Sequence, residues 1–328
     1  MSVEAATWAW AFGQLGFEVR TVAGAGRADR IVAGLALDAA AGPAAAEVAE
    51  ALDGVGLVVV ENVLSLPLNP DAGAVLATVL AGRRSLLRHH DLAWQRAAAS
   101  GADNDPPPDD PAWCHVTIND LSRRQLADRG IGAATIRNAF DPDPPAGDRE
   151  GTRHRLGLGP ADRLVVQPTR ALPRKNVPAA VALAEGLGAT YWLLGPAEDG
   201  YGAELAAVLA AARVPVVHGL GATTVADAYA AADVVAFPST WEGFGNPVVE
   251  SALYRRPLAI GRYPVAAELA AFGFRWFEAD DVEGLDAWLS RPNSALLDRN
   301  QAVARHHFSR VDLPGRLATL LDGQGWTW

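Results

Sequence analysis

Residues 233-DVVAFPSTWEGFGNPVVESALYRRPLAI-260 contain, in one run, the pattern of a strand, a turn, a helix and a second strand. The apolar segments 233–238 and 257–261 are typical of buried parallel strands. Glycines on both sides of Phe244 allow a tight turn. Asn246 suits an N-cap and Pro247 a first helical position, so we expect a helix from about 247. This strand–helix–strand unit predicts a parallel α/β sheet.

The same alternation extends through the rest of the chain. Further strands are predicted at 164–168, 190–195 and 214–219, and in the first half around 18–23, 56–62, 84–89, 114–118 and 133–137. Helices are predicted near 3–16, 72–82 and 121–129, with a helical tail from about 294 to 322. We therefore predict two doubly wound Rossmann-like domains that face a cleft, the natural place for an active site.

The Pro/Gly/Asp-rich stretch 141–151 separates the two series. It predicts an N-terminal domain at 1–145 and a C-terminal domain at 146–305. The tail 306–328 is expected to return toward the first domain. The first series opens on a helix, whereas such domains usually open on a strand. We therefore expect the N-terminal domain to lack its usual first strand, because of either an upstream start or a shortened chain.

Composition excludes several classes of protein. The 328 residues are 50% hydrophobic and 20% charged, as in globular proteins, and the formal net charge is −10. An acidic chain is a poor nucleic-acid binder, and we expect neither nucleic acid nor membrane as a partner. A single cysteine excludes an internal disulfide and a cysteine metal cluster. With no signal-peptide pattern, the expected location is the cytoplasm.

The quoted stretch also carries the strongest candidate site. A helix that begins near 247 directs its positive end at the turn, which suits a phosphate, and Gly243 and Gly245 leave backbone N–H groups accessible. Glu250, expected in the first helical turn, could accept two hydroxyl hydrogen bonds, as from a ribose. Glu242 and Glu250 form an E-x7-E pair. The structural alternative is a capped helix with exposed glutamates; the turn, the cap and the preceding strand favour a site.

Two further clusters follow predicted strands. Thr169, Arg170 and Lys175 come after the strand at 164–168, and Lys175 is the only lysine of the chain. A guanidinium and a compact ammonium suit a diphosphate, whereas Arg174 is expected to be solvated. His89, His90 and Asp91 follow the strand at 84–89 and could bind a polar substrate or act as an acid–base pair. A structural role for these histidines fits equally well, and no metal site is predicted.

These pieces, in this order, resemble retaining nucleotide-sugar glycosyltransferases of the GT-B fold, family 4 type. The resemblance lies in 170-RALPRKN-176, 194-LGP-196, the block 233–260, 117-TIN-119 with 136-IRNAFD-141, and 89-HHD-91. It implies that Arg170 and Lys175 bind the donor diphosphate and that Glu250 binds the ribose. It also implies that Glu242, with the backbone of Gly243, Phe244 and Gly245, holds the donor sugar. His90 corresponds to a histidine beside the reacting sugar, with His89 as the alternative and Asp91 as a residue that orients it.

The expected activity is therefore transfer of a hexosyl unit from a nucleoside-diphosphate sugar to a hydroxyl acceptor, a small molecule or a glycan. The resemblance implies retention at the anomeric carbon with no metal or other cofactor. The alternatives are a GT-B nucleotide-sugar epimerase or hydrolase, and a shortened relative that binds nucleotide sugars without catalysis. The sequence does not identify the base, the sugar or the acceptor.

Overall fold

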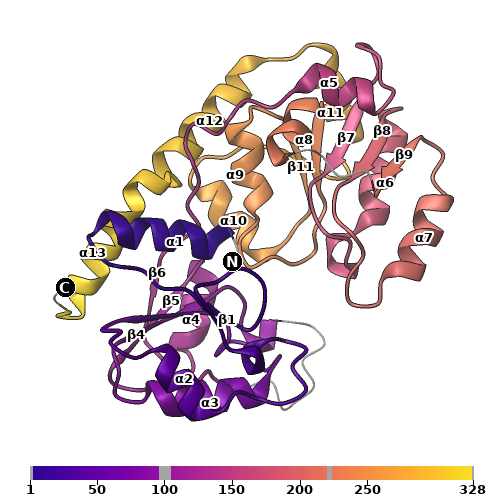
Figure 1. The fold of residues 1–328 in the computed structure, drawn as a ribbon. Helices are drawn as coiled ribbons and strands as arrows, with labels where there is room; N and C mark the ends of the chain where they lie inside the picture. The colour runs from indigo at the N-terminus through magenta and orange to yellow at the C-terminus, as the bar shows by residue number, and fades with distance from the viewer. Residues whose placement is uncertain (1–2, 96–104, 220–223, 327–328) are drawn as a thin grey trace. The chain divides into compact units, whose positions relative to one another are not determined.

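The computed structural model describes residues 3–95, 105–219 and 224–326, which divide into two compact units. Unit 1 consists of residues 1–139 and 310–328, and unit 2 of residues 140–309. Both are built on parallel sheets with helices on their faces (Figure 1). The predicted α/β fold with two Rossmann-like parts is thereby confirmed. Each unit is described by itself below.

Unit 1 has a main sheet of four parallel strands in the order β3-β4-β5-β6. Strand order follows chain order, so the order does not reverse within this sheet. The elements of the unit are α1 (Val3–Gln14), β1 (Val22–Ala23), β2 (Arg30–Ile31), η1 (Ala33–Leu35), α2 (Ala45–Ala51), β3 (Val58–Glu61), α3 (Pro70–Leu80), β4 (Ser85–His89), η2 (Ala93–Gln95), β5 (Trp113–Thr117), α4 (Asp120–Ala127), β6 (Ala133–Thr135), η4 (Arg310–Asp312) and α13 (Leu313–Gly323).

Helices pack on both faces of this sheet. Successive side chains of a strand point to opposite faces, so each strand contributes apolar side chains to both layers. Leu86 packs with α1 and α13, whereas its neighbour Leu87 packs with α2 and α3 on the other face. Helix α13 from the tail thus lies against α1 (Figure 1). Both clusters are apolar, which makes β4 a strand buried on its two faces.

The predicted strand at 18–23 is wrong over most of its length. Only Val22–Ala23 is a strand, and it pairs with β2 in a separate two-stranded sheet. Residues 18–20 are exposed and pair with no strand. Thr21 instead bonds to Asp29, through both its N–H (2.8 Å) and its hydroxyl (2.7 Å). These bonds join Thr21 to Asp29, and no strand pairing continues through residues 18–20, which an apolar–polar alternation cannot reveal.

Unit 2 has a six-stranded parallel sheet in the order β12-β11-β10-β7-β8-β9. Strand order reverses between β7 and β10, which defines a switch point of a doubly wound sheet. Its elements are α5 (Arg149–Arg155), β7 (Leu164–Gln167), η3 (Pro173–Lys175), α6 (Val177–Gly186), β8 (Thr190–Leu193), α7 (Gly202–Ala210), β9 (Val216–His218), α8 (Val225–Ala231), β10 (Val234–Phe237), α9 (Asn246–Leu253), β11 (Leu258–Ile260), α10 (Pro264–Ala271), β12 (Phe277–Glu278), α11 (Val282–Ser290) and α12 (Ser294–His307).

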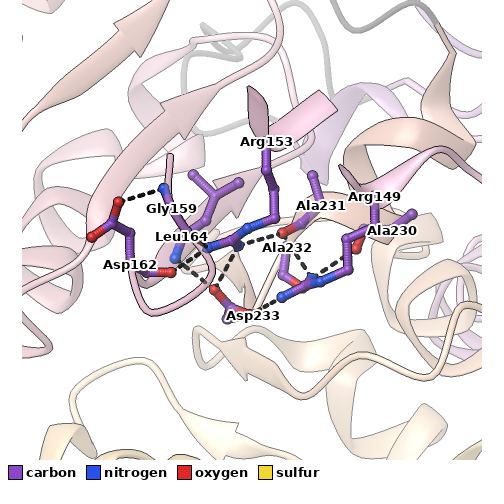
Figure 2. Close-up of polar contacts among 9 residues, drawn as sticks. All are labelled: Arg149, Arg153, Gly159, Asp162, Leu164, Ala230, Ala231, Ala232 and Asp233. Carbon is purple, nitrogen blue, oxygen red and sulfur yellow. Dashed lines mark hydrogen bonds and ion pairs between the residues drawn. The ribbon is translucent and has the colours of Figure 1, made fainter. Parts of the chain in front are cut away.

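Two arginines, partly exposed Arg149 and buried Arg153, join α5 to the amino ends of β7 and β10 (Figure 2). Arg149 donates to the carbonyls of Ala230, Ala231 and Ala232, which end α8 without helical partners. Arg149 and Arg153 both bond to Asp233, at 2.6 and 3.0 Å. Asp233 also accepts the N–H of Leu164, the first residue of β7, at 2.9 Å. The opposite, carboxyl ends of the same strands are left for the site.

Candidate functional site

In unit 2 the predicted site residues follow the carboxyl ends of β7 and β10, on either side of the switch point. Gln167 ends β7 and is fully buried. It accepts the hydroxyl of Tyr191 at 2.6 Å and donates to the carbonyl of Lys175 at 2.9 Å and to Thr169 Oγ1 at 3.3 Å. A buried polar network therefore contacts the loop 168–175 and fixes the position of the Lys175 backbone.

Lys175 and Glu242 form a buried ion pair, 8% and 7% exposed. Burial lowers the pKa of Lys175, and the neighbouring carboxylate opposes that shift. The second carboxylate oxygen of Glu242 accepts from Arg174 at 3.0 Å, and Arg174 also donates to the carbonyl of Trp241 at 3.1 Å. The expectation that Arg174 is solvated is therefore met only in part, since its side chain is 35% exposed but has two protein partners. A general rule for basic loops gave that expectation. The rule could not reveal the partners of Arg174, because they lie 67 and 68 residues away in the chain.

Arg170 lies further out than Lys175. Its guanidinium is exposed and pairs with Glu198 at 2.6 Å. Its charge still contributes to lowering the pKa of Lys175. The loops after β7 and β8 meet here: the N–H of Gly195 donates to Thr169 O at 3.1 Å, and a Cβ at Gly195 would lie 2.5 Å from Arg170 Cα. With Arg174, three cations thus lie by two carboxylates, an arrangement that can receive an anion.

Helix α9 begins one residue earlier than predicted. Asn246 is its first residue, and the N-cap is Gly245, whose φ of 104° favours glycine. A Cβ at Gly245 would lie 2.2 Å from the hydroxyl oxygen of Tyr263, which donates to the carbonyl of Phe244 at 3.2 Å. The Phe244 ring packs between Phe140 and Phe308 in the core. Phe244 therefore anchors the turn.

Glu250 lies in the second turn of α9, not in the first, because the helix starts at Asn246. Its carboxylate accepts a hydrogen bond from Tyr229 at 2.6 Å. The ring of Tyr229 is buried and stacks on Tyr254, with centroids 5.0 Å apart. Burial and the charge of Glu250 raise the pKa of Tyr229, so its hydroxyl stays a donor. Tyr229 was not predicted, because the sequence of the α8 segment does not show that the Tyr229 side chain contacts Glu250.

Two buried donors in the loop after β10 have no hydrogen-bond partner among the described residues. They are Ser239 Oγ and Trp241 Nε1, which lie on either side of Thr240 and next to Glu242. An unsatisfied buried polar group is costly and uncommon. The loop after β10 thus carries two buried donors that could bind a polar group, although Arg256 Nε and Trp288 Nε1 elsewhere in unit 2 are unsatisfied in the same way.

In unit 1 the two neighbouring histidines differ in exposure and in their bonding partners. His89 is buried, whereas His90 is partly exposed just beyond the end of β4. His90 Nε2 bonds to Glu61 at 2.7 Å, and the other oxygen of Glu61 pairs with buried Arg88 at 3.0 Å. Burial alone would raise the pKa of Glu61, but the bond to His90 and the charge of Arg88 outweigh it and lower the pKa.

Glu61 and Asn62 both bond to His90 and were not predicted as candidate site residues. Asn62 Oδ1 accepts the N–H of His90 at 2.9 Å and that of Asp91 at 3.3 Å, so it fixes the backbone after β4. Asn62 itself has a φ of 64°, which Asn tolerates better than most residues. The available signal was position: both polar residues end the apolar strand 56-GLVVVEN-62.

Among the described residues, no group of three or more His, Cys, Asp or Glu side chains is arranged to hold a metal ion. No helix within the ranges 3–95, 105–219 and 224–326 has the length and apolar character needed to cross a membrane.

Known proteins resemble this chain in sequence and fold. Residues 174–287 match the family model of glycosyl transferases group 1, which confirms the predicted resemblance to glycosyltransferases. The mannosylglucosylglycerate synthase of Thermotoga maritima is 24% identical over 320 residues, which cover 79% of this chain and 74% of that protein. The Petrotoga mobilis protein of the same name is 24% identical over 270 residues, covering 66% and 62%.

Two solved structures show the same fold. Anabaena Alr3699/HepE in complex with UDP-glucose superposes with a TM-score of 0.68 at 22% identity, over 86% of this chain and 82% of that one. Sucrose-phosphate synthase from Thermosynechococcus elongatus gives a TM-score of 0.64 at 16% identity, over 85% and 77%. The predicted GT-B type of fold is confirmed by these similarities.

Proposed function

We infer that the chain is a glycosyltransferase, since residues 174–287 match the group 1 glycosyl transferases, and we propose that it transfers a hexosyl unit from a nucleoside-diphosphate sugar to a hydroxyl acceptor. The observation that carries the proposal is the cluster of Lys175, Glu242 and Arg174 at the switch point of unit 2. Ligands of doubly wound sheets bind at this point. The UDP-glucose bound to the HepE protein supports a donor of this class.

The roles proposed for the residues follow their chemistry. Lys175 and Arg170 bind the diphosphate, with Thr169 beside them. Glu250, oriented by Tyr229, accepts hydrogen bonds from the ribose. Glu242 and the turn Gly243–Phe244–Gly245, together with Asn246, bind the donor sugar and its phosphate. Because Glu242 is paired with Lys175 and Arg174, donor binding would exchange some of these bonds for bonds to the ligand.

The proposed reaction breaks the bond from the anomeric carbon to the diphosphate oxygen and forms a bond to the acceptor oxygen. The electron pair of the broken bond goes to the β-phosphate, which also receives the acceptor's proton. Negative charge therefore grows where Lys175, Arg170 and the α9 N-terminus are already placed, and preorganised positive charge lowers such a barrier. We propose retention of the anomeric configuration and no metal requirement, since these cations can do the work of a divalent ion.

Release of nucleoside diphosphate tests this function. The protein is incubated with UDP-glucose, GDP-mannose and other nucleoside-diphosphate sugars, with and without EDTA. Acceptors include glycerate and glucosylglycerate, because two relatives are named for a mannosylglucosylglycerate product. We expect acceptor-dependent release from one donor, unaffected by EDTA and lost in Lys175→Ala. The matched control is Arg213→Ala, which removes an exposed cation paired with Glu185.

Other products would contradict parts of the proposal. Free sugar without an acceptor would indicate a hydrolase, and an isomerised donor an epimerase. Release that EDTA abolishes would contradict metal independence, and NMR of the product's anomeric proton reads retention or inversion. Absence of release from every donor, with binding intact, would indicate a nucleotide-sugar-binding protein instead of an enzyme.

A further inference from the structure

Four side chains of unit 1 form an unbroken chain of hydrogen bonds, here called the Asp109 chain. Ser65 Oγ lies 2.6 Å from His89 Nδ1, and His89 Nε2 lies 2.8 Å from His115 Nδ1. His115 Nε2 lies 3.1 Å from Asp109 Oδ1. The two imidazole rings are stacked, 8° from parallel. Ser65 and both histidines are buried, whereas Asp109 is half exposed.

The carboxylate at one end fixes the direction of every proton in the Asp109 chain. Each neutral imidazole has one donor and one acceptor nitrogen, and an ionised Asp109 only accepts. His115 therefore carries its proton on Nε2 and accepts on Nδ1. His89 must then donate from Nε2 and accept on Nδ1, which leaves the Ser65 hydroxyl as donor. Burial and the neighbouring His115 lower the pKa of His89 to about 3, so it stays neutral.

The Asp109 chain ends on the loop that holds the His90 backbone. The N–H of Ser65 donates to the carbonyl of Asn62 at 3.1 Å, which closes a turn over 62–65. The side chain of Asn62 accepts the N–H of His90 at 2.9 Å, and its own N–H donates to Arg88 O at 2.9 Å. His89 precedes His90 directly in the chain. The loop after β3 and the residues after β4 are thus tied together at two points.

We propose that Asp109, His115, His89 and Ser65 are positioning residues that hold Asn62, and through it His90, in the geometry used for sugar transfer. None of the four needs to touch a ligand. Removing the carboxylate would let the proton order run in either direction, so the Ser65 hydroxyl would no longer be fixed as a donor to His89. The role given to His90 in this inference rests on the proposed function. The order of the protons in the Asp109 chain does not depend on that function.

The first experiment reads the proton order without any activity. Nitrogen-15 NMR of the histidine side chains separates protonated from unprotonated ring nitrogens. In the wild-type protein we expect both His89 and His115 as single Nε2–H tautomers. In Asp109→Ala, a change at a half-exposed position, we expect both tautomers of each ring. The control is Asp38→Ala, another exposed aspartate of unit 1, which should leave the wild-type pattern. Unchanged tautomers in Asp109→Ala would overturn the proposal.

The second experiment links the Asp109 chain to turnover by a double-mutant cycle. In Asp109→Ala and in Ser65→Ala we expect kcat to fall roughly 10-fold, as small misplacements of a reacting group do, with the donor KM little changed. The double variant should lose no more than either single variant, since each breaks the same chain. Ser65 and Asp109 do not touch, so multiplied losses in the double variant would contradict a shared chain. A fall in donor affinity alone would contradict positioning.

The two experiments fail separately. If the wild-type protein transfers no sugar, the proposed function fails, and the NMR result still decides whether Asp109 orders the protons. If sugar transfer is present and kcat is unchanged in Asp109→Ala, the positioning role fails and the proposed function stands.

Discussion

At the scale of single residues, the buried ion pair of Lys175 with Glu242 is the feature of unit 2 on which the proposed function depends most. Both partners are more than nine-tenths buried, so their charges are desolvated and depend on one another. Removing one partner of such a pair leaves an uncompensated charge, whereas replacing both with apolar residues is often tolerated. The pair therefore has measurable consequences for stability that are distinct from its role in binding.

The first prediction separates these consequences. Glu242→Leu should lower the free energy of unfolding by about 3 kcal/mol, the scale found for broken buried pairs. Lys175→Met combined with Glu242→Leu should recover most of that loss, although neither variant binds nucleoside diphosphate. Urea denaturation measures the stabilities. A double variant as unstable as Glu242→Leu would show that the loss of stability does not come from an unpaired buried charge.

His89 gives a prediction for pH. Its pKa is about 3 in the folded protein, below the 6.5 of an unperturbed histidine, mainly because of burial. Between these two values the unfolded chain binds a proton that the folded protein does not. Stability should therefore fall as the pH drops from 6.5 toward 3, by at most about 1.4 kcal/mol per pH unit from this group. The pKa of His115 is also lowered by burial, against the opposing effect of Asp109, and adds in the same direction.

Denaturation curves at several pH values check this dependence. In His89→Gln the slope of stability against pH should become smaller between pH 6.5 and 4.5, whatever the variant's stability at neutral pH. An unchanged slope would mean that His89 is charged in the folded protein or is not buried.

The sequence singled out candidate residues but not the partners that they contact. Lys175 and Glu242 were singled out because a cationic loop and a Gly-rich turn each follow a predicted strand. That they pair with one another, and that Arg174 joins them, depends on two loops 67 residues apart meeting at the switch point. Tyr229 and Glu61 escaped notice for the same reason, since they reach Glu250 and His90 from other elements.

At the scale of elements, the anchor of α5 is the feature most open to test. Arg153 is 5% exposed and bonds to Asp233, to the carbonyl of Ala231, and to the carbonyls of Gly159 and Asp162 (Figure 2). It holds α5 against α8 and the amino ends of β7 and β10, far along the strands from the loops of the site.

Arg153→Ala should therefore destabilise unit 2 without touching the ligand. We expect a loss of about 2–4 kcal/mol, since a buried charge pair and several carbonyl bonds are broken together. Nucleoside diphosphate affinity of the folded protein should stay unchanged. Arg155→Ala, half exposed on the same helix, should cost under about 1 kcal/mol. Thermal unfolding with calorimetric titration measures both effects; equal losses in the two variants would contradict the anchor.

Most elements could be predicted because apolar runs of four or five residues mark buried strands. β7, β8 and β10 lie within the predicted segments, and α9 begins within one residue of its prediction. Short elements could not be predicted: β12 has two residues, and β1 keeps only two of the six expected. Each depends on pairing with another short strand, β12 with β11 and β1 with β2, and residues 18–20 pair with no strand.

At the scale of the whole molecule, the sequence predicted two α/β parts but not their strand orders. Alternating strands and helices require parallel sheets, and the reversal between β7 and β10 in unit 2 agrees with a doubly wound fold. In unit 1 the four strands run in chain order, and periodicity carries no information about that. The tail illustrates the same limit: its helical character was evident, but its packing on α1 depends on side chains from both chain ends.

The central claim is that the switch point of unit 2 binds the diphosphate of a sugar nucleotide through Lys175. Calorimetric titration of UDP, GDP, ADP and dTDP into the wild-type protein, Lys175→Ala and Lys175→Arg tests it most directly. We predict that at least one nucleotide binds the wild type. Affinity should fall at least about 10-fold in both variants, because a planar guanidinium does not replace a compact ammonium. Arg213→Ala should bind as the wild type does. Binding of none of the four, or equal binding by wild type and Lys175→Ala, would contradict the claim.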